Sequence, residues 1–142
     1  MIRSGGAKIP TVALGLGLTG LLPFLWGVVV TQTGALALPA VVQPHIAVQA
    51  YGLMIFCFMA GTLWGFAAKA GWSVGYVLSI LPVLFFMALA ALGLPIGFVL
   101  MAGFVILLPL DGLFQKRAAA PQWWLKLRIG LSLVVLACLY TL

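Results

Sequence analysis

The sequence predicts an all-α integral membrane protein, a single bundle of about five transmembrane helices spanning residues 1–142. Hydrophobic residues make up 65% of the 142-residue chain and charged residues only 6%, whereas a soluble domain carries about 25% charged residues. Seven lysines and arginines plus one acid cannot cover a surface that faces water. Two further observations support this class: five separate apolar runs, and cations that flank those runs on alternate connections.

A helix that crosses a bilayer needs about 20 mostly apolar residues. The expected spans are residues 9–30, 46–68, 72–92, 94–110 and 123–142. The first run is longer than the apolar stretch of a signal peptide, which has about 7–15 residues, so we expect a retained helix.

The connections and prolines suggest how these spans are joined. Residues 31–45 carry no formal charge and contain two prolines, so this connection should lie in the outer membrane interface or dip into it. Gly93 alone separates the third and fourth runs, which predicts a tight antiparallel hairpin. Pro23 and Pro82 fall inside the first and third spans and are expected to bend them, because proline removes a helical hydrogen bond.

The distribution of cations predicts the orientation, because positively charged loops remain cytoplasmic. The cations are Arg3, Lys8, Lys69, Lys116, Arg117, Lys126 and Arg128. All fall on one side of a five-span topology, which places the N-terminus on the cytoplasmic side and the C-terminus on the outer side of the membrane. Because the cations border apolar runs rather than forming a basic face on a soluble domain, nucleic acid is not an expected partner.

The last span is short. Residues 129–142 would cover only about 21 Å as a helix, less than the roughly 30 Å hydrocarbon core. Arg128 must therefore reach toward the cytoplasm, tilt or thin the membrane locally, or find a partner. Asp111 ends the fourth span at the same depth, so we expect it to pair with Arg128 or Lys126.

Trp123 and Trp124 complete this junction, because tryptophan anchors helices at the membrane interface. We expect the junction to join the last two spans as a structural contact. A proton or substrate role for Asp111 is the alternative, although functional ionisable groups usually lie deeper in a bundle.

Helix packing is expected along the second span. Gly61 and Gly65 are four residues apart, and small residues at this spacing let transmembrane helices approach closely. Together with Trp64, and with Ala60 and Ala68 nearby, they should mark a packed face.

No arrangement typical of an enzyme, metal site or cofactor site is present. One acid cannot form a catalytic carboxylate pair, and Ser79 and Ser132 have no histidine at a comparable depth to activate them. Met54 and Cys57 share a helix face and would suit Cu(I), but both are ordinary packing residues. His45 lies alone at the outer side; a lone histidine can be a metal ligand or a proton acceptor, but metal sites need clustered ligands, so we expect a polar interfacial residue. We therefore expect no metal, no cofactor and no enzymatic activity.

The order of several local motifs resembles the DUF3429 family of small bacterial and mitochondrial membrane proteins. The matching stretches are Ile9-Pro10, Gly20–Phe24 (GLLPF), Phe58–Gly65 (FMAGTLWG), Ser79–Pro82 (SILP), Asp111, Pro121–Trp124 (PQWW) and Leu127-Arg128. The chain departs from the family at Leu63, where histidine or arginine is common, and at Trp124, where tyrosine is common. The resemblance implies a multi-pass inner-membrane protein and implies no particular activity.

Two functions remain open at this point. The first is a non-enzymatic accessory, assembly or interaction subunit that works through contacts with membrane lipids, other membrane subunits or a second copy of itself. The second is a carrier or channel for a small solute or a lipid, which requires polar groups that converge within the bundle. The polar candidates inside the spans are Thr19, Thr62, Ser79 and Ser132, and their convergence on one cavity would favour the carrier.

Overall fold

The computed structural model describes residues 8–142, which form six helices. These are α1 (Thr11–Thr19), α2 (Leu22–Thr33), α3 (Pro44–Ala70), α4 (Ser73–Ala91), α5 (Ile96–Lys116) and α6 (Trp124–Thr141). The described residues contain no strand. Arg3, one of the cations used to predict orientation, lies outside them.

The first two helices together make one span. Taken as one segment, Thr11–Thr33 is 23 residues long, and it joins α3, α4, α5 and α6 as five helical segments long and apolar enough to cross a membrane. The predicted class, an all-α bundle of five membrane-length helices, is therefore confirmed.

The interruption between α1 and α2 lies just before Pro23. Pro23 occupies the first turn of α2, where its missing N–H group is tolerated. The Tyr51 hydroxyl of α3 donates a hydrogen bond to the Gly20 carbonyl oxygen at 2.9 Å. The first span is thus broken between two short helices, and α3 binds it at the break.

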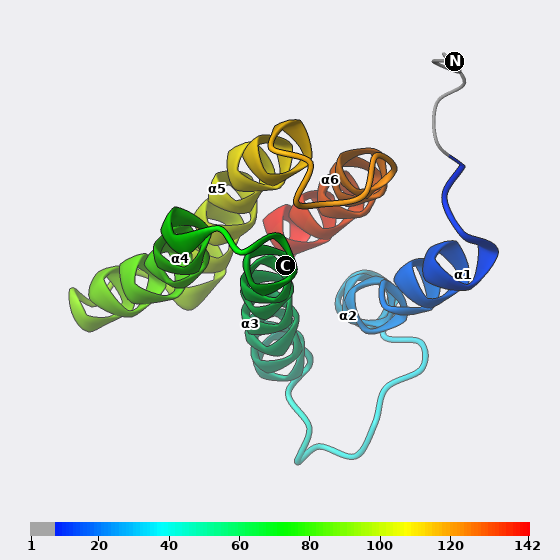
Figure 1. Ribbon diagram of the computed structural model, residues 1–142. Helices are drawn as coiled ribbons and strands as arrows, with labels where there is room; N and C mark the ends of the chain where they lie inside the picture. Colours follow the sequence, from blue (N-terminus) through cyan, green and yellow to red (C-terminus); the bar gives the residue numbers. More distant parts are fainter. Residues whose placement is uncertain (1–7) are drawn as a thin grey trace.

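The bundle is built around α3, which packs against α2, α4 and α5, while α6 packs against α1, α2 and α5 (Figure 1). Aromatic side chains fill the centre. Phe56 of α3 contacts Phe104 of α5 with ring centroids 6.1 Å apart. Gly103 permits this approach, because a Cβ there would lie 2.7 Å from the Phe56 ring.

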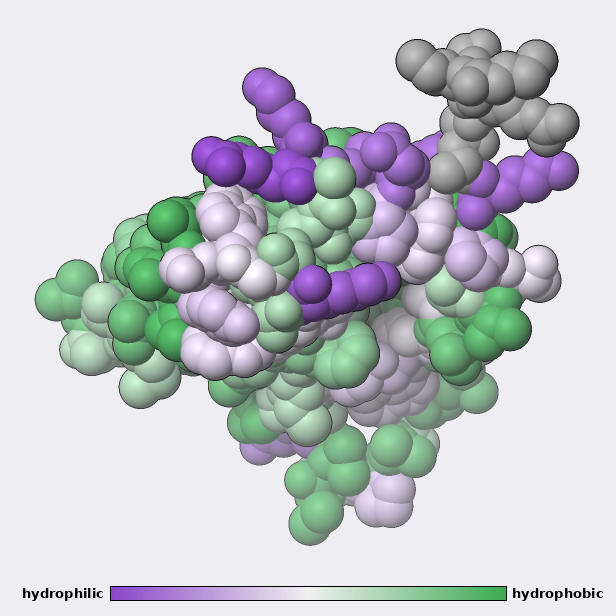
Figure 2. Space-filling model, in the orientation of Figure 1, coloured by the Kyte–Doolittle hydropathy of each residue, from purple (hydrophilic) through white to green (hydrophobic). Residues whose placement is uncertain are grey.

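The outer surface of the bundle is apolar. Side chains such as Leu84, Phe98 and Leu133 are 58–61% exposed. In Figure 2 the flanks of the molecule are hydrophobic, and hydrophilic residues gather over the connection between α5 and α6. This pattern is that of helices surrounded by lipid rather than water.

The cation-bearing helix ends lie side by side. Trp72, between α3 and α4, packs edge to face on Phe114 near the end of α5, with ring centroids 5.0 Å apart. The Arg117 guanidinium lies 5.1 Å from the centre of the Trp72 ring. Lys69 and Lys116, in the last turns of α3 and α5, are therefore at one end of the bundle.

The connections differ in length from those expected. Residues 92–95 join α4 to α5, and Gly93 adopts a left-handed conformation with φ of +81°, which glycine permits without steric cost. Residues 34–43 join α2 to α3 without a helix, and the Trp26 indole N–H donates to the Leu36 carbonyl oxygen at 3.1 Å. Pro82 lies buried inside α4, which continues on both sides of it.

The helix that contains the fourth span extends past residue 110, where the span was expected to end, because α5 continues to Lys116 and holds Asp111 inside it. The Asp111 carboxylate bonds to partners on α6. Phe114 also keeps this last part of α5 in the core, with 0% of its surface exposed.

Candidate functional site

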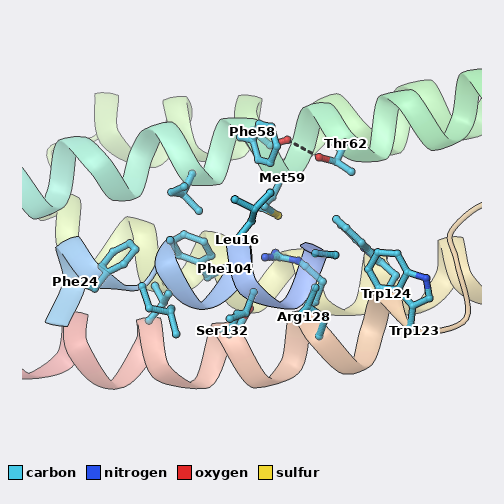
Figure 3. A pocket seen from close by; sticks show the side chains of 18 residues that line it. Leu16, Phe24, Phe58, Met59, Thr62, Phe104, Trp123, Trp124, Arg128 and Ser132 are labelled. Atoms are coloured by element: carbon cyan, nitrogen blue, oxygen red, sulfur yellow. Dashed lines mark hydrogen bonds between the residues drawn. The ribbon is translucent and has the colours of Figure 1, made fainter. Parts of the chain in front are cut away.

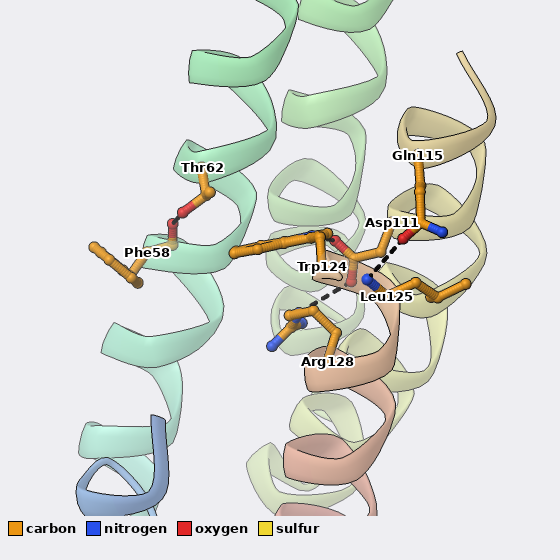
Figure 4. A network of polar contacts seen from close by, with 7 residues as sticks. All are labelled: Phe58, Thr62, Asp111, Gln115, Trp124, Leu125 and Arg128. Carbon is orange, nitrogen blue, oxygen red and sulfur yellow. Dashed lines mark hydrogen bonds and ion pairs between the residues drawn. The ribbon is translucent and has the colours of Figure 1, made fainter. Parts of the chain in front are cut away.

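The Asp111 carboxylate forms the centre of a buried polar cluster, which we call the Asp111 cluster: Asp111, Trp124 and Arg128. The Trp124 indole Nε1–H donates to Asp111 Oδ1 at 2.8 Å, and Arg128 Nε–H donates to Oδ2 at 3.0 Å. The side chains of Arg128 and Asp111 are only 4% and 2% exposed. Figure 4 shows both donors reaching from α6 toward α5.

The helical register explains this choice of partner. Trp124 and Arg128 are four residues apart, so they lie on one face of α6 and reach the same carboxylate. Lys126, the other partner considered, falls on the opposite face, is exposed and makes no ion pair within residues 8–142. Asp111 thus has both oxygens bonded, as a buried carboxylate requires.

Two further contacts connect the start of α6 to α5 and to α3. The Gln115 side-chain oxygen, one turn after Asp111, accepts a hydrogen bond from the Leu125 backbone N–H at 3.0 Å, which satisfies one of the free N–H groups at the start of α6. Gln115 was not among the predicted site residues, although its i+4 spacing from Asp111 was a usable signal. Trp124 also packs edge to face on Phe66 of α3, with ring centroids 5.0 Å apart, and contacts half-buried Trp123.

The far side of the Arg128 guanidinium borders a cavity. Arg128 Nη2 and the Ser132 hydroxyl oxygen are buried and have no hydrogen-bond partner among residues 8–142. Both residues line a cavity of about 340 Å³ between α1, α2, α3 and α6. In Figure 3 they face Leu16 and Met59, and the rest of the lining is almost entirely apolar.

Two of the four predicted hydroxyl residues line this cavity, Thr62 and Ser132. The Thr62 hydroxyl already donates to the Phe58 carbonyl oxygen of its own helix at 2.9 Å. Thr19 and Ser79 lie elsewhere and likewise bond to carbonyl oxygens one turn back. Ser132 is therefore the one of these four whose hydroxyl is both buried and unpartnered.

The expected packed face at Gly61 and Gly65 is wrong for contacts within the chain. Both glycines are exposed, and a Cβ added to either would meet nothing within 4 Å. The buried stripe of α3 instead runs through Phe56, Ala60, Leu63 and Ala67, a register that excludes the glycines. Trp64 is 45% exposed and packs against the Tyr76 ring, with centroids 4.7 Å apart.

The residues considered for metal binding lie apart. Met54 and Cys57 are exposed on α3. His45, also exposed, lines a separate hollow of about 180 Å³ with Gln49 and Tyr140. Within the part of the chain that the structure describes, no three His, Cys, Asp or Glu side chains come together in a way that could hold a metal ion.

Comparison with known proteins supports the resemblance carried by the motifs. Residues 9–142 match the family described as "Protein of unknown function (DUF3429)". No curated protein and no solved structure gives a significant match. Because the match covers nearly the whole chain, this protein belongs to the DUF3429 family.

Proposed function

We propose that the protein is a non-enzymatic carrier or binding protein of a bacterial inner membrane that holds a lipid-soluble small molecule inside its bundle. The observation that carries this proposal is the cavity beside Arg128. Its wall is largely apolar, and two buried polar atoms of its lining residues, Arg128 Nη2 and the Ser132 hydroxyl oxygen, lack hydrogen-bond partners among residues 8–142. Of the two functions open from the sequence, this geometry favours the carrier over the accessory subunit.

The size of the cavity supports an occupant. Small-molecule sites in proteins have volumes of roughly 300–1,000 Å³ and apolar walls with a few placed polar groups. The cavity of about 340 Å³ falls in this range. The cavity is partly open toward the surface of the bundle, so a lipid chain or a lipid-soluble molecule can enter it.

The position of the cavity supports entry from the bilayer. Leu16 of α1 and Phe58 of α3 line the cavity and are 68% and 65% exposed. The segment that carries Leu16 is the short helix α1, which ends at the break before α2. A lipid-soluble molecule therefore reaches the cavity sideways between α1 and α3, without crossing water.

Photo-crosslinking tests this function. The protein in lipid nanodiscs is illuminated with a long-chain alkyl probe that carries a diazirine, and the labelled peptides are identified by mass spectrometry. We expect labelling of cavity-lining residues on α1, α3 and α6. Ala13, half-buried, lines the cavity, whereas its neighbour Val12 is 73% exposed and does not. Ala13→Phe should abolish cavity labelling and the matched variant Val12→Phe should not; labelling that ignores Ala13→Phe contradicts the proposal.

The proposed orientation has the N-terminus in the cytoplasm and the C-terminus outside. The gathering of Lys69, Lys116 and Arg117 at one end of the bundle supports it, because such ends remain cytoplasmic. A reporter that is active only in the periplasm, fused after Leu142, should be active. Its silence, with an active cytoplasmic reporter at the same position, contradicts this orientation.

A second candidate function, an accessory or assembly subunit, is favoured by the open glycine face of α3. Small residues allow close contact between transmembrane helices, and no side chain among residues 8–142 covers Gly61 or Gly65. Purification in a mild detergent should then recover a stoichiometric membrane subunit. Gly61→Ile should release it, and Gly15→Ile, at an equally open glycine of α1, should not. Recovery of the bare chain in every case excludes this function.

A further inference from the structure

We infer that the molecule held in the cavity carries an uncharged carbonyl group, and that Arg128 Nη2 and the Ser132 hydroxyl donate hydrogen bonds to it. This inference rests on the proposed function and names the chemical class of the ligand. An ester of a lipid and a quinone ring both present such an oxygen, and the experiment below separates the two sources.

The two free polar atoms point to a hydrogen-bond acceptor. A guanidinium has five N–H donors and no acceptor, and Asp111 binds Arg128 only through Nε. Nη2 is buried without a partner, a condition that is unfavourable for any donor removed from water. In Figure 4 the free end of the guanidinium turns away from Asp111 toward α3, where the cavity lies.

Ser132 extends the same polar patch. It lies four residues after Arg128 on α6, so the two side chains occupy one face a single turn apart. Its hydroxyl is buried and unpartnered, like Nη2. An oxygen atom seated between them receives one hydrogen bond from each.

The charge of the Asp111 cluster argues for an uncharged ligand. Arg128 is already neutralised by its ion pair with Asp111, and among the residues that the structure describes no other cation lines the cavity. A carboxylate in this space would add an uncompensated charge to an apolar surrounding, which is strongly unfavourable. A carbonyl oxygen accepts both hydrogen bonds without changing the net charge.

The rest of the wall suits an apolar body. The Trp124 N–H and the Thr62 hydroxyl line the cavity but are already bonded, to Asp111 and to Phe58. The lining continues along α6 through Leu131 to Val135 and meets Phe104 of α5. The ligand therefore places its carbonyl near the cation-bearing end of the bundle and its hydrocarbon part deeper, along α6.

Competition between matched molecules tests this chemistry. Methyl oleate, oleate and octadecene have similar chains and present a neutral carbonyl, a carboxylate and no acceptor, respectively. Each competes against the diazirine probe for the cavity in nanodiscs. We expect methyl oleate to compete about tenfold better than octadecene, the gain from one or two hydrogen bonds, and oleate to compete less well than its ester. Equal competition by all three, or the strongest competition by oleate, overturns the inference.

A fourth competitor separates the two sources of the carbonyl. A benzoquinone with a decyl side chain presents the same acceptor on a planar ring. Stronger competition than methyl oleate assigns the site to a quinone-like ring, and weaker competition assigns it to a lipid ester.

Variants test whether the preference for a carbonyl ligand depends on the Arg128 and Ser132 donors. Ser132→Ala should reduce the advantage of methyl oleate over octadecene several-fold. Arg128→Lys, which keeps a cation opposite Asp111 but lacks Nη2, should reduce this advantage as well. Ser79→Ala is the matched control, because Ser79 is buried but bonds to Tyr76 in its own helix. If methyl oleate keeps its full advantage over octadecene in Ser132→Ala, the inference is overturned.

The proposed function and the carbonyl chemistry of the ligand are contradicted by different results. If no competitor displaces the probe and Ala13→Phe does not change labelling, the cavity holds no lipophilic molecule and the proposed function fails. If Ala13→Phe abolishes labelling while all competitors displace the probe equally, the function stands and only the carbonyl chemistry is wrong.

Discussion

The two sides of the Arg128 guanidinium differ in what surrounds them. On the α5 side, Nε bonds to Asp111, and Trp124 binds the other carboxylate oxygen. On the α3 side, Nη2 and the Ser132 hydroxyl face an apolar cavity without a partner. One buried cation therefore has its Nε bonded on the α5 side and its Nη2 without a partner among residues 8–142 on the other side, and the proposed ligand would bind on that second side.

The same contrast appears among the glycines. Gly103 lies against the Phe56 ring, whereas Gly61 and Gly65 meet no neighbour. Gly103 contributes to packing within the chain, whereas the surfaces at Gly61 and Gly65 are free for the contacts proposed above. Four substitutions test how far this distinction holds, beginning with the largest expected effect.

Asp111→Ala should be the most destabilising change. It leaves Arg128 buried without its counter-charge, and breaking a buried pair in this way costs about 3–5 kcal/mol. Unfolding in mixed micelles, followed by circular dichroism, measures the loss. The double variant Asp111→Asn with Arg128→Gln removes both charges and should recover much of it; a stable Asp111→Ala protein would mean that the α5 side of the guanidinium is not structural.

Trp124→Phe should have an intermediate effect. The phenyl ring keeps most of the contact with Phe66 but loses the hydrogen bond to Asp111 Oδ1. A buried acceptor left with one fewer donor costs about 1–3 kcal/mol. The same unfolding measurement should place this variant between the wild type and Asp111→Ala, and a loss as large as that of Asp111→Ala would assign the stability to the indole instead of the ion pair.

Lys126→Ala should change stability by no more than about 0.5 kcal/mol, as is usual for exposed positions. Lys126 is exposed and forms no ion pair among the residues described. A loss comparable with that of Asp111→Ala would show that Lys126 competes for Asp111 in the membrane.

Ser132→Ala should have the smallest effect on the ligand-free protein, near zero or slightly stabilising. The substitution removes a buried hydroxyl that has no partner to lose. Unfolding of delipidated protein in detergent measures this, and native lipid should then stabilise the wild type more than the variant. A large loss without lipid would mean that Ser132 has a partner within the fold and that the α3 side of Arg128 is not open.

Several features could be predicted from the sequence because they depend on properties of single helices, such as hydropathy, length and the positions of charges. Hydropathy summed over a helix length predicted five membrane-length segments, and the positions of Lys69, Lys116 and Arg117 predicted a common charged end. The pairing of Asp111 was narrowed to Arg128 or Lys126 by depth alone. These arguments need only the rise per residue of a helix and the cost of charge in hydrocarbon.

The tertiary structure decided the features that depend on which helix faces meet. The rotation of α6 selects Arg128 and Trp124 for Asp111, and the register of α3 turns Gly61 outward. The cavity exists because the broken first span leaves a gap beside α6 that its own side chains do not fill. Periodicity along one helix carries no information on such gaps, since they arise from the volumes and angles of several helices packed together. The sequence alone thus determined a bundle of five membrane-length segments with one charged end. Only the packing of the helices decided which helix faces contact one another and which line the cavity or remain exposed.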